Sequence, residues 1–184
     1  MSGRPGHIYE LAQIGATAQL DYASELFAEA PDLNFFIIDG NHDQWFKEKA
    51  NIGLTGGVEL QNRNPNVKFL GEWEARIMLH PKVELMLFHS NDGTAYADSY
   101  KLQKLVESLE GGKKPDLILS GHYHKQVAIF RRNVFAFECG TLCGQTRFMR
   151  GKKLQAHLGF GIIELWAGKR RIERLRHEFF PYYD

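Results

Sequence analysis

Three short apolar segments of this sequence each end in a turn that carries histidine. The segments 34–38, 83–88 and 116–119 are continuous hydrophobic runs, which are typical of strands buried on both faces of a sheet. They end, in this order, at Gly40-Asn-His-Asp43, at His89 and at Gly121-His-Tyr-His124. Sites in open α/β sheets gather at the carboxyl ends of the strands, so we expect these side chains to converge at one edge.

The rest of the pattern predicts an α/β chain that ends in antiparallel hairpins. Apolar residues at helical spacing predict helices over 8–30, 43–50 and 98–109, and glycines predict a loop over 53–57. Further strands are predicted at 67–70, 74–79, 126–131, 134–138, 159–166 and 169–176.

Composition is that of a soluble globular chain. The 184 residues are 43% hydrophobic and 24% charged, with 23 Lys and Arg against 22 Asp and Glu. No global charge therefore steers the chain toward nucleic acid or a membrane. No apolar run approaches a membrane span of about 20 residues, and no signal-peptide core is present, so we expect a cytoplasmic protein. Cys139 and Cys143 are expected to be reduced, buried structural thiols.

The strand-end residues have the chemistry of a metal site. Imidazoles with an amide oxygen suit manganese, iron or zinc. His122 and His124 are two positions apart, so in an extended segment both would face the same side. The alternative for each histidine is a hydrogen-bonded turn residue, and we adopt it for the histidines outside comparable turns, namely His7, His80, His157 and His177.

The motifs Gly40-Asn-His-Asp43, His89 and Gly121-His-Tyr-His124, in this order and spacing, resemble the calcineurin-like metallophosphoesterase family over essentially the whole chain. The resemblance implies a four-layer αββα sandwich with mixed sheets, and hydrolysis of phosphate mono- or diesters through a hydroxide that bridges two metals. It also implies a divalent transition metal: manganese, iron, zinc or nickel.

The resemblance assigns a role to each motif residue. Asn41, His89 and His122 correspond to three ligands of one metal, and His124 corresponds to a ligand of the other. His42 corresponds to the catalytic histidine near the scissile phosphate, which stabilises the transition state or protonates the leaving oxygen. Asp43 is expected to be a turn residue.

The chain departs from the family at its beginning. The family's Asp-x-His and Gly-Asp-x-x-Asp motifs are absent, and with them a bridging carboxylate. We therefore expect at most one tightly bound metal, or none, and an exposed apolar sheet surface with an unpaired edge. Three explanations stay open: a single domain over residues 1–184 that is truncated at its N-terminus, a site completed by another chain or a second copy, or a degenerate relative. The opening residues Ser2 to Gly6 favour the truncation.

The functional hypothesis is a metal-dependent phosphoesterase, and the alternative is a catalytically inactive interaction or oligomerisation module. Two basic runs, one from Arg147 to Lys153 and one from Lys169 to Arg176, are expected to be solvated surfaces, with nucleic-acid binding as the weaker hypothesis. Three aromatic residues near the motifs are expected to be packing residues rather than contacts to a leaving group: Trp45, Phe46 and Tyr123.

Overall fold

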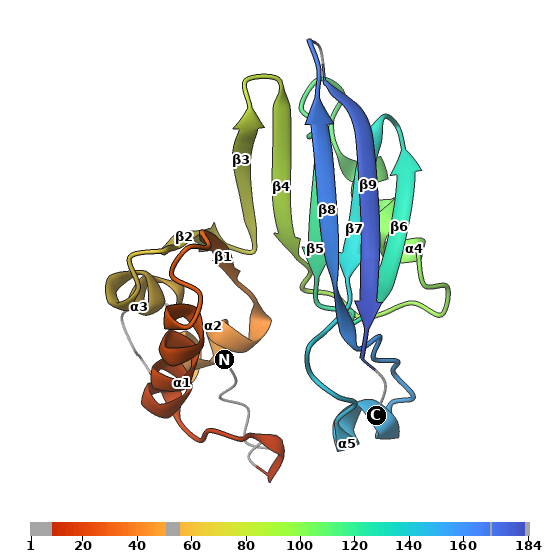
Figure 1. The fold of residues 1–184 in the computed structure, drawn as a ribbon. Coiled ribbons are helices and arrows are strands. Elements are labelled where there is room, and N and C mark those ends of the chain that lie inside the picture. Colours follow the sequence, from red (N-terminus) through yellow and green to blue (C-terminus); the bar gives the residue numbers. More distant parts are fainter. Residues whose placement is uncertain (1–8, 51–55, 170, 183–184) are drawn as a thin grey trace. The chain divides into compact units, whose positions relative to one another are not determined.

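The computed structural model describes residues 9–50, 56–169 and 171–182, which belong to two compact units (Figure 1). Unit 1 spans Met1–Ala75 and unit 2 spans Arg76–Asp184. The expectation of one domain over the whole chain stays a prediction. None of the described helices combines the length and the apolar composition that a bilayer span requires.

Unit 1 consists of three helices and a parallel strand pair. Its elements are α1 (Ala16–Ala28), β1 (Phe35–Asp39), α2 (Asn41–Ala50), α3 (Gly56–Arg63) and β2 (Val67–Glu72). Strands β1 and β2 are parallel, with Phe35 opposite Val67. Leu20 of α1, Leu60 of α3 and Val67 of β2 form the core, so both helices pack on the strand pair.

Several sequence predictions for unit 1 are wrong in detail. The first helix begins at Ala16 rather than at residue 8, because Gly15 has a φ of 90°, which a right-handed helix does not allow. Part of the predicted loop at 53–57 is instead the first turn of α3. Strand β1 is not buried on both faces, since Phe36 is 45% exposed.

Unit 2 is built on a five-stranded mixed sheet with the strand order β3-β4-β5-β7-β6. Its strands are β3 (Glu74–His80, beginning at the end of unit 1), β4 (Val83–His89), β5 (Leu117–Gly121), β6 (Gln126–Arg131) and β7 (Val134–Cys139). Strands β4, β5 and β7 run parallel, whereas β6 is antiparallel to β7. Helix α4 (Tyr100–Ser108) connects β4 to β5, and helix α5 (Arg147–Gly151) precedes the hairpin of β8 (Gly159–Ala167) and β9 (Ile172–Pro181).

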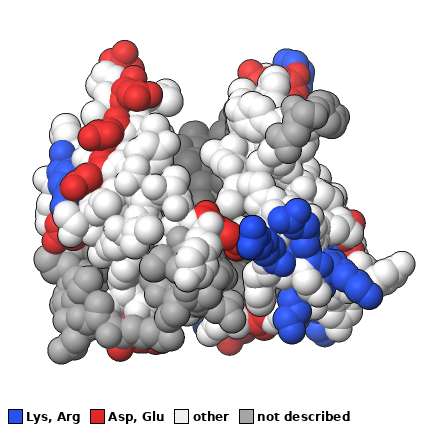
Figure 2. Space-filling model, turned by 90° about the horizontal axis from the view of Figure 1, so that it is seen from below, with Lys and Arg blue, Asp and Glu red and all other residues white. Residues whose placement is uncertain are grey.

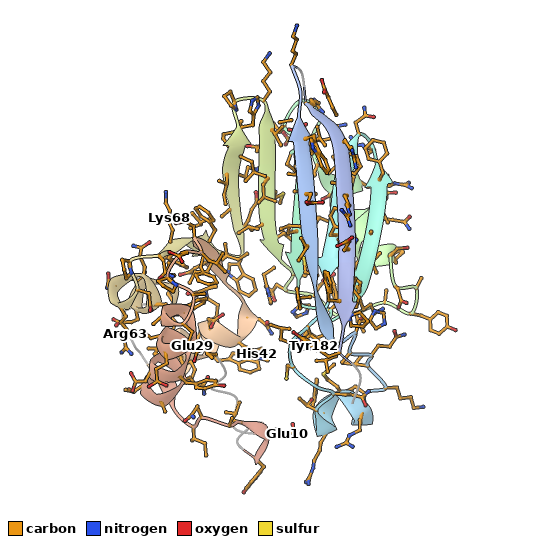
Figure 3. All side chains as sticks on the ribbon, viewed as in Figure 1. Glu10, Glu29, His42, Arg63, Lys68 and Tyr182 are labelled. Carbon is orange, nitrogen blue, oxygen red and sulfur yellow. The ribbon has the colours of Figure 1, made fainter. Side chains whose placement is uncertain are left out.

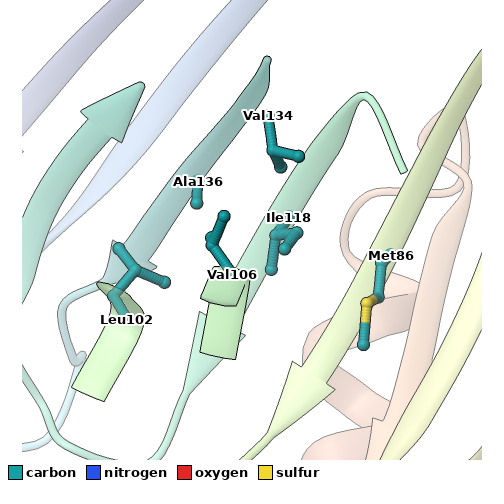
Figure 4. Packing of buried hydrophobic residues seen from close by; sticks show 6 residues of the cluster. All are labelled: Met86, Leu102, Val106, Ile118, Val134 and Ala136. Atoms are coloured by element: carbon teal, nitrogen blue, oxygen red, sulfur yellow. The ribbon is translucent and has the colours of Figure 1, made fainter. Parts of the chain in front are cut away.

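The sheet of unit 2 is covered on both faces. On one face, Leu102 and Val106 of α4 pack against alternate residues of the central strands, which Figure 4 shows: Met86, Ile118, Val134 and Ala136. On the other face the hairpin covers the residues between them, namely Leu85, Leu117 and Phe137. Because successive strand residues point to opposite faces, the continuous apolar runs supply both layers. The α/β class with a central mixed sheet is confirmed.

Unit 2 also corrects three expectations. The strand predicted at 169–176 begins at Ile172, after a turn in which Gly168 N donates to Arg171 O over 2.8 Å. Helix α5 replaces part of what was expected to be a basic loop. Cys139 and Cys143 are free thiols, as predicted, but both are exposed rather than buried.

Candidate functional site

His89 and His122 leave the sheet of unit 2 at the same edge. Strands β4 and β5 are parallel neighbours with His89 opposite Gly121, so the two histidines follow adjacent carboxyl ends. Their ring centroids lie 5.2 Å apart and their planes meet at 78°. The expected convergence of strand-end histidines therefore holds for this pair.

The absence of a side chain at Gly121 leaves room for the ring of His89. A Cβ atom at this position would lie 3.3 Å from His89 Nδ1, closer than ordinary van der Waals contact. Glycine is thus favoured here by the close approach of the His89 ring rather than by an unusual backbone angle.

The turn after β5 holds two histidines with positive φ, a backbone conformation that is uncommon for residues other than glycine. His122 has a φ of 100° and His124 a φ of 57°. The segment is therefore not extended, and the expectation that both side chains face one side through strand alternation is wrong. Such conformations cost about 1–3 kcal/mol each, and they cluster at functional sites, where the surrounding structure enforces them.

His124 is half-buried, and its buried Nδ1 atom has no hydrogen-bond partner among the described residues. Burial, and then the charge of His122, lower the pKa of His124, which favours the neutral imidazole. A buried nitrogen without a partner costs free energy, about 1–3 kcal/mol. A ligand that approached Nδ1 would recover that cost.

A carbonyl group fixes the tautomer of His122. Its Nε2 lies 2.9 Å from Asp92 O, and a carbonyl oxygen only accepts, so Nε2 carries the proton. In the neutral ring the lone pair is therefore on Nδ1, where it can bind a cation. Orientation of a ligating imidazole by a backbone carbonyl is the arrangement found in many metal sites.

A polar network that was not predicted from the sequence links Tyr123, in the turn after β5, to residues that follow β4. Tyr123 donates to Asp92, Lys101 forms an ion pair with Asp92, and Ser90 Oγ donates to Asp92 Oδ1 over 3.0 Å. Burial would raise the pKa of Asp92, but the hydrogen bonds from Lys101, Tyr123 and Ser90 outweigh it and hold the pKa at about 2. Burial and the bond to Asp92 raise the pKa of Tyr123. The polar residues directly after His89 were the available signal.

Two buried ionisable side chains, Lys125 and Glu138, also lie in unit 2. Lys125 Nζ is 2.9 Å from Asp98 Oδ1 and 2.9 Å from Ala95 O. Glu138 is 2% exposed, and neither carboxylate oxygen has a hydrogen-bond partner among the described residues. Burial raises the pKa of Glu138 to about 7, with Lys125 lowering it and Asp98 raising it. The sequence signal for a buried Glu138 was an acidic residue in an apolar strand, on the same face as Val134 and Ala136.

Asn41 and His42 belong to unit 1, where they form the first turn of α2 rather than a loop. The ring of His42, labelled in Figure 3, stacks on Trp45 with centroids 4.5 Å apart, so Trp45 is a packing residue as predicted. Asp43 Oδ2 accepts from Gly40 N over 2.9 Å, which confirms its role in the turn. The roles of Asn41 and His42 stay predictions.

Two of the histidines that we interpreted as structural, His157 and His177, have structural contacts. His157 Nδ1 accepts from Gln126 N over 2.9 Å. The ring of His177 packs on Phe137 with centroids 4.8 Å apart, and His177 Nε2 lies 3.2 Å from Gln126 Nε2. The interpretation is confirmed for both residues, whereas His7 lies outside the described residues.

The donors of unit 2 fit a metal in chemistry but do not enclose one point. The imidazoles of His89, His122 and His124 are nitrogen ligands, and the buried Nδ1 of His124 needs a partner. Within residues 9–50, 56–169 and 171–182, however, no three His, Cys, Asp or Glu side chains gather closely enough to hold an ion. These three histidines would hold a metal only after their side chains adjust.

Comparison with known proteins gives similarity to solved structures only. No family model and no curated protein matches the chain. An archaeal phosphodiesterase is 16% identical, with a TM-score of 0.48, over 85% of this chain and 76% of that one. Vps29 from Cryptosporidium parvum is 16% identical, with a TM-score of 0.47, over 86% of each chain.

A third similar structure, Vps29 from Entamoeba histolytica complexed with zinc, is 13% identical, with a TM-score of 0.41, over 82% of this chain and 95% of that one. The assignment to the mixed α/β class rests on the sheet order and the layers of this chain itself.

Proposed function

We propose that this chain is a metal-dependent phosphoesterase whose site in unit 2 is formed by His89, His122 and His124. The observation that supports the proposal most is the pair of imidazoles at adjacent strand ends, 5.2 Å apart, beside a strained turn. Strand ends of this kind are where α/β folds place their sites.

The chain's own residues have distinct tasks in this proposal. The strand register holds His89, and Asp92 O orients His122 so that its Nδ1 lone pair is available. His124 adds a buried nitrogen that lacks a described partner. A bound divalent metal would supply a Lewis acid for the phosphoryl oxygen and would activate water. Asn41 and His42 remain sequence-based predictions for a ligand and a proton donor.

The test is hydrolysis of bis(p-nitrophenyl) phosphate by the full chain, first stripped with a chelator and then supplied with manganese or zinc. We expect metal-dependent turnover that falls about 100-fold or more in His122→Ala and in His89→Ala, because each change removes a proposed ligand. His80→Ala is the matched control, since His80 is an exposed residue at the end of β3. It should retain full activity.

Metal analysis of the same samples separates the alternatives. The proposal is wrong if the folded chain neither binds metal nor hydrolyses the ester under any of these conditions. If light scattering then shows that the metal-free chain forms a stable complex with itself or a partner, the inactive interaction module is the better description. Equal activity in His80→Ala and His122→Ala would also contradict the assigned site.

A further inference from the structure

The segment between Glu138 and Glu164 is positively charged although the whole chain is nearly neutral. It contains four basic residues and no Asp or Glu, while the net charge of the chain is only +1. The basic residues are Arg147, Arg150, Lys152 and Lys153. In the view of Figure 2, Lys and Arg side chains gather in one cluster over the α5 end of unit 2.

Helix α5 gives these residues a defined place on the surface. Thr146 caps the helix by accepting from Met149 N over 3.2 Å, and Met149 is buried at 6% exposure. Gln145 Nε2 donates to Leu154 O over 2.7 Å, which closes the segment on itself. Arg150, Lys152 and Lys153 are exposed, and none of them forms an ion pair with another residue in the described part of the chain.

The second basic run, on the β8–β9 hairpin, is different because three of its described cations already have partners. Arg171 Nε lies 3.4 Å from Asp116, and Arg176 pairs with Glu164 and Glu178. The guanidinium of Arg174 lies 4.2 Å from the ring centroid of Trp166. A polyanion would have to displace these contacts, so the α5 segment is the better site for one.

Aromatic rings border the same region. Phe160 and Phe180 stack with centroids 5.2 Å apart and planes at 14°, and Tyr182 lies 5.9 Å from Phe160. A hollow of about 460 Å³ is lined by Gly144 and Gln145, directly before α5, and by Tyr182 at the end of β9. Tyr182, labelled in Figure 3, is 53% exposed.

From this combination we propose that the α5 segment and Tyr182 bind single-stranded nucleic acid. Phosphates would contact the unpaired cations, and a base would enter the hollow and stack on Tyr182, which is the pairing of a basic track with aromatic platforms typical of single-strand binders. A lipid surface would use the cations but would leave the hollow and its aromatic wall without a role. The inference does not depend on the proposed phosphoesterase activity.

The test is fluorescence anisotropy of a labelled oligothymidylate with the full chain at several salt concentrations. Three phosphate contacts, one for each of the unpaired cations, predict a slope of about −2 for log affinity against log salt, and hence a loss of about 20-fold between about 50 and 200 mM salt. In Arg150→Gln/Lys152→Gln the magnitude of the slope should fall to about 0.7, because one of the three contacts remains. Tyr182→Ala should weaken binding about 5- to 100-fold, because one stacked base is lost.

Lys104→Gln/Lys113→Gln is the matched control, since it removes two exposed positive charges from elsewhere in unit 2. It should leave both slope and affinity unchanged. Thermal unfolding of every variant establishes that each is folded. The proposal is overturned by an absence of binding at low salt, by equal losses in the control, or by binding to anionic phosphatidylserine vesicles without binding to the oligonucleotide.

Discussion

Gly121 lies so close to His89 that a Cβ atom would be 3.3 Å from the Nδ1 atom of the ring. Gly121→Ala should therefore displace the imidazole by a few tenths of an ångström without straining the backbone. We expect metal affinity and ester hydrolysis to fall about tenfold, while the free energy of unfolding changes by about 1 kcal/mol or less. Isothermal titration with zinc and urea unfolding measure the two quantities.

Gly111→Ala is the control for that change, because a Cβ atom there would meet nothing within 4 Å. It should alter neither quantity. A Gly121→Ala chain with wild-type metal affinity would show that the position of the His89 ring does not matter for a metal.

His124→Asn should separate ligand loss from loss of structure. Asparagine tolerates the left-handed backbone of this position, and the change removes a buried nitrogen that has no described partner. We therefore expect the free energy of unfolding to change by less than about 1 kcal/mol, while metal affinity drops about tenfold or more.

His157→Asn should have the opposite effect, a loss of stability without a loss of metal affinity. It removes the acceptor of Gln126 N and the contact of His157 Nε2 with Gln155, so it should destabilise the fold by about 1–2 kcal/mol. Metal affinity should stay at the wild-type value. If both variants lost the same amount of affinity, His124 would not be a ligand.

The sequence predicted the location of the candidate site better than its internal geometry. Continuous apolar runs end at His89 and before His122 because β4 and β5 are covered on both faces, so the strand ends could be read directly. The left-handed backbone at His122 and His124 could not be predicted from the sequence, because it depends on tertiary contacts rather than on residue preference.

The missed elements have similar physical causes. Helix α3 is short and begins with two glycines, Gly56 and Gly57, which have low helix propensity, so its stability comes from packing through Leu60. Phe36 belongs to an apolar run, yet its side chain is exposed, so hydrophobicity alone did not predict burial at this position. Among the described residues, its strand β1 pairs with β2 only.

Tyr123→Phe should raise the pKa of Asp92 from about 2 toward its ordinary value, because one of the hydrogen bonds that stabilise the carboxylate is lost. The low pKa makes a small stabilising contribution that is present at pH values above about 4 and is lost as the pH falls toward 2. Carbon-detected NMR titration of the Asp92 carboxyl group measures the shift. Tyr96→Phe, at a fully exposed position, should leave the titration unchanged.

Glu138 predicts a loss of stability as the pH rises from about 4.5 to about 7. Its pKa is about 7 in the folded protein, against an ordinary value of 4.5, so over this window the folded state keeps a proton that the unfolded state releases. The free energy of unfolding should fall by up to about 3 kcal/mol and then level off.

Glu138→Gln removes this titration while it keeps the size of the side chain. Urea unfolding of both proteins at pH 5 and pH 7.5 isolates the contribution of Glu138, because the histidines and the other carboxylates contribute equally to the wild-type chain and to the variant. We expect the wild-type chain to lose more stability than the variant between the two pH values, by about 1–3 kcal/mol. Parallel pH dependences would mean that Glu138 is already ionised at pH 5, through its attraction to Lys125, and that its burial does not raise the pKa.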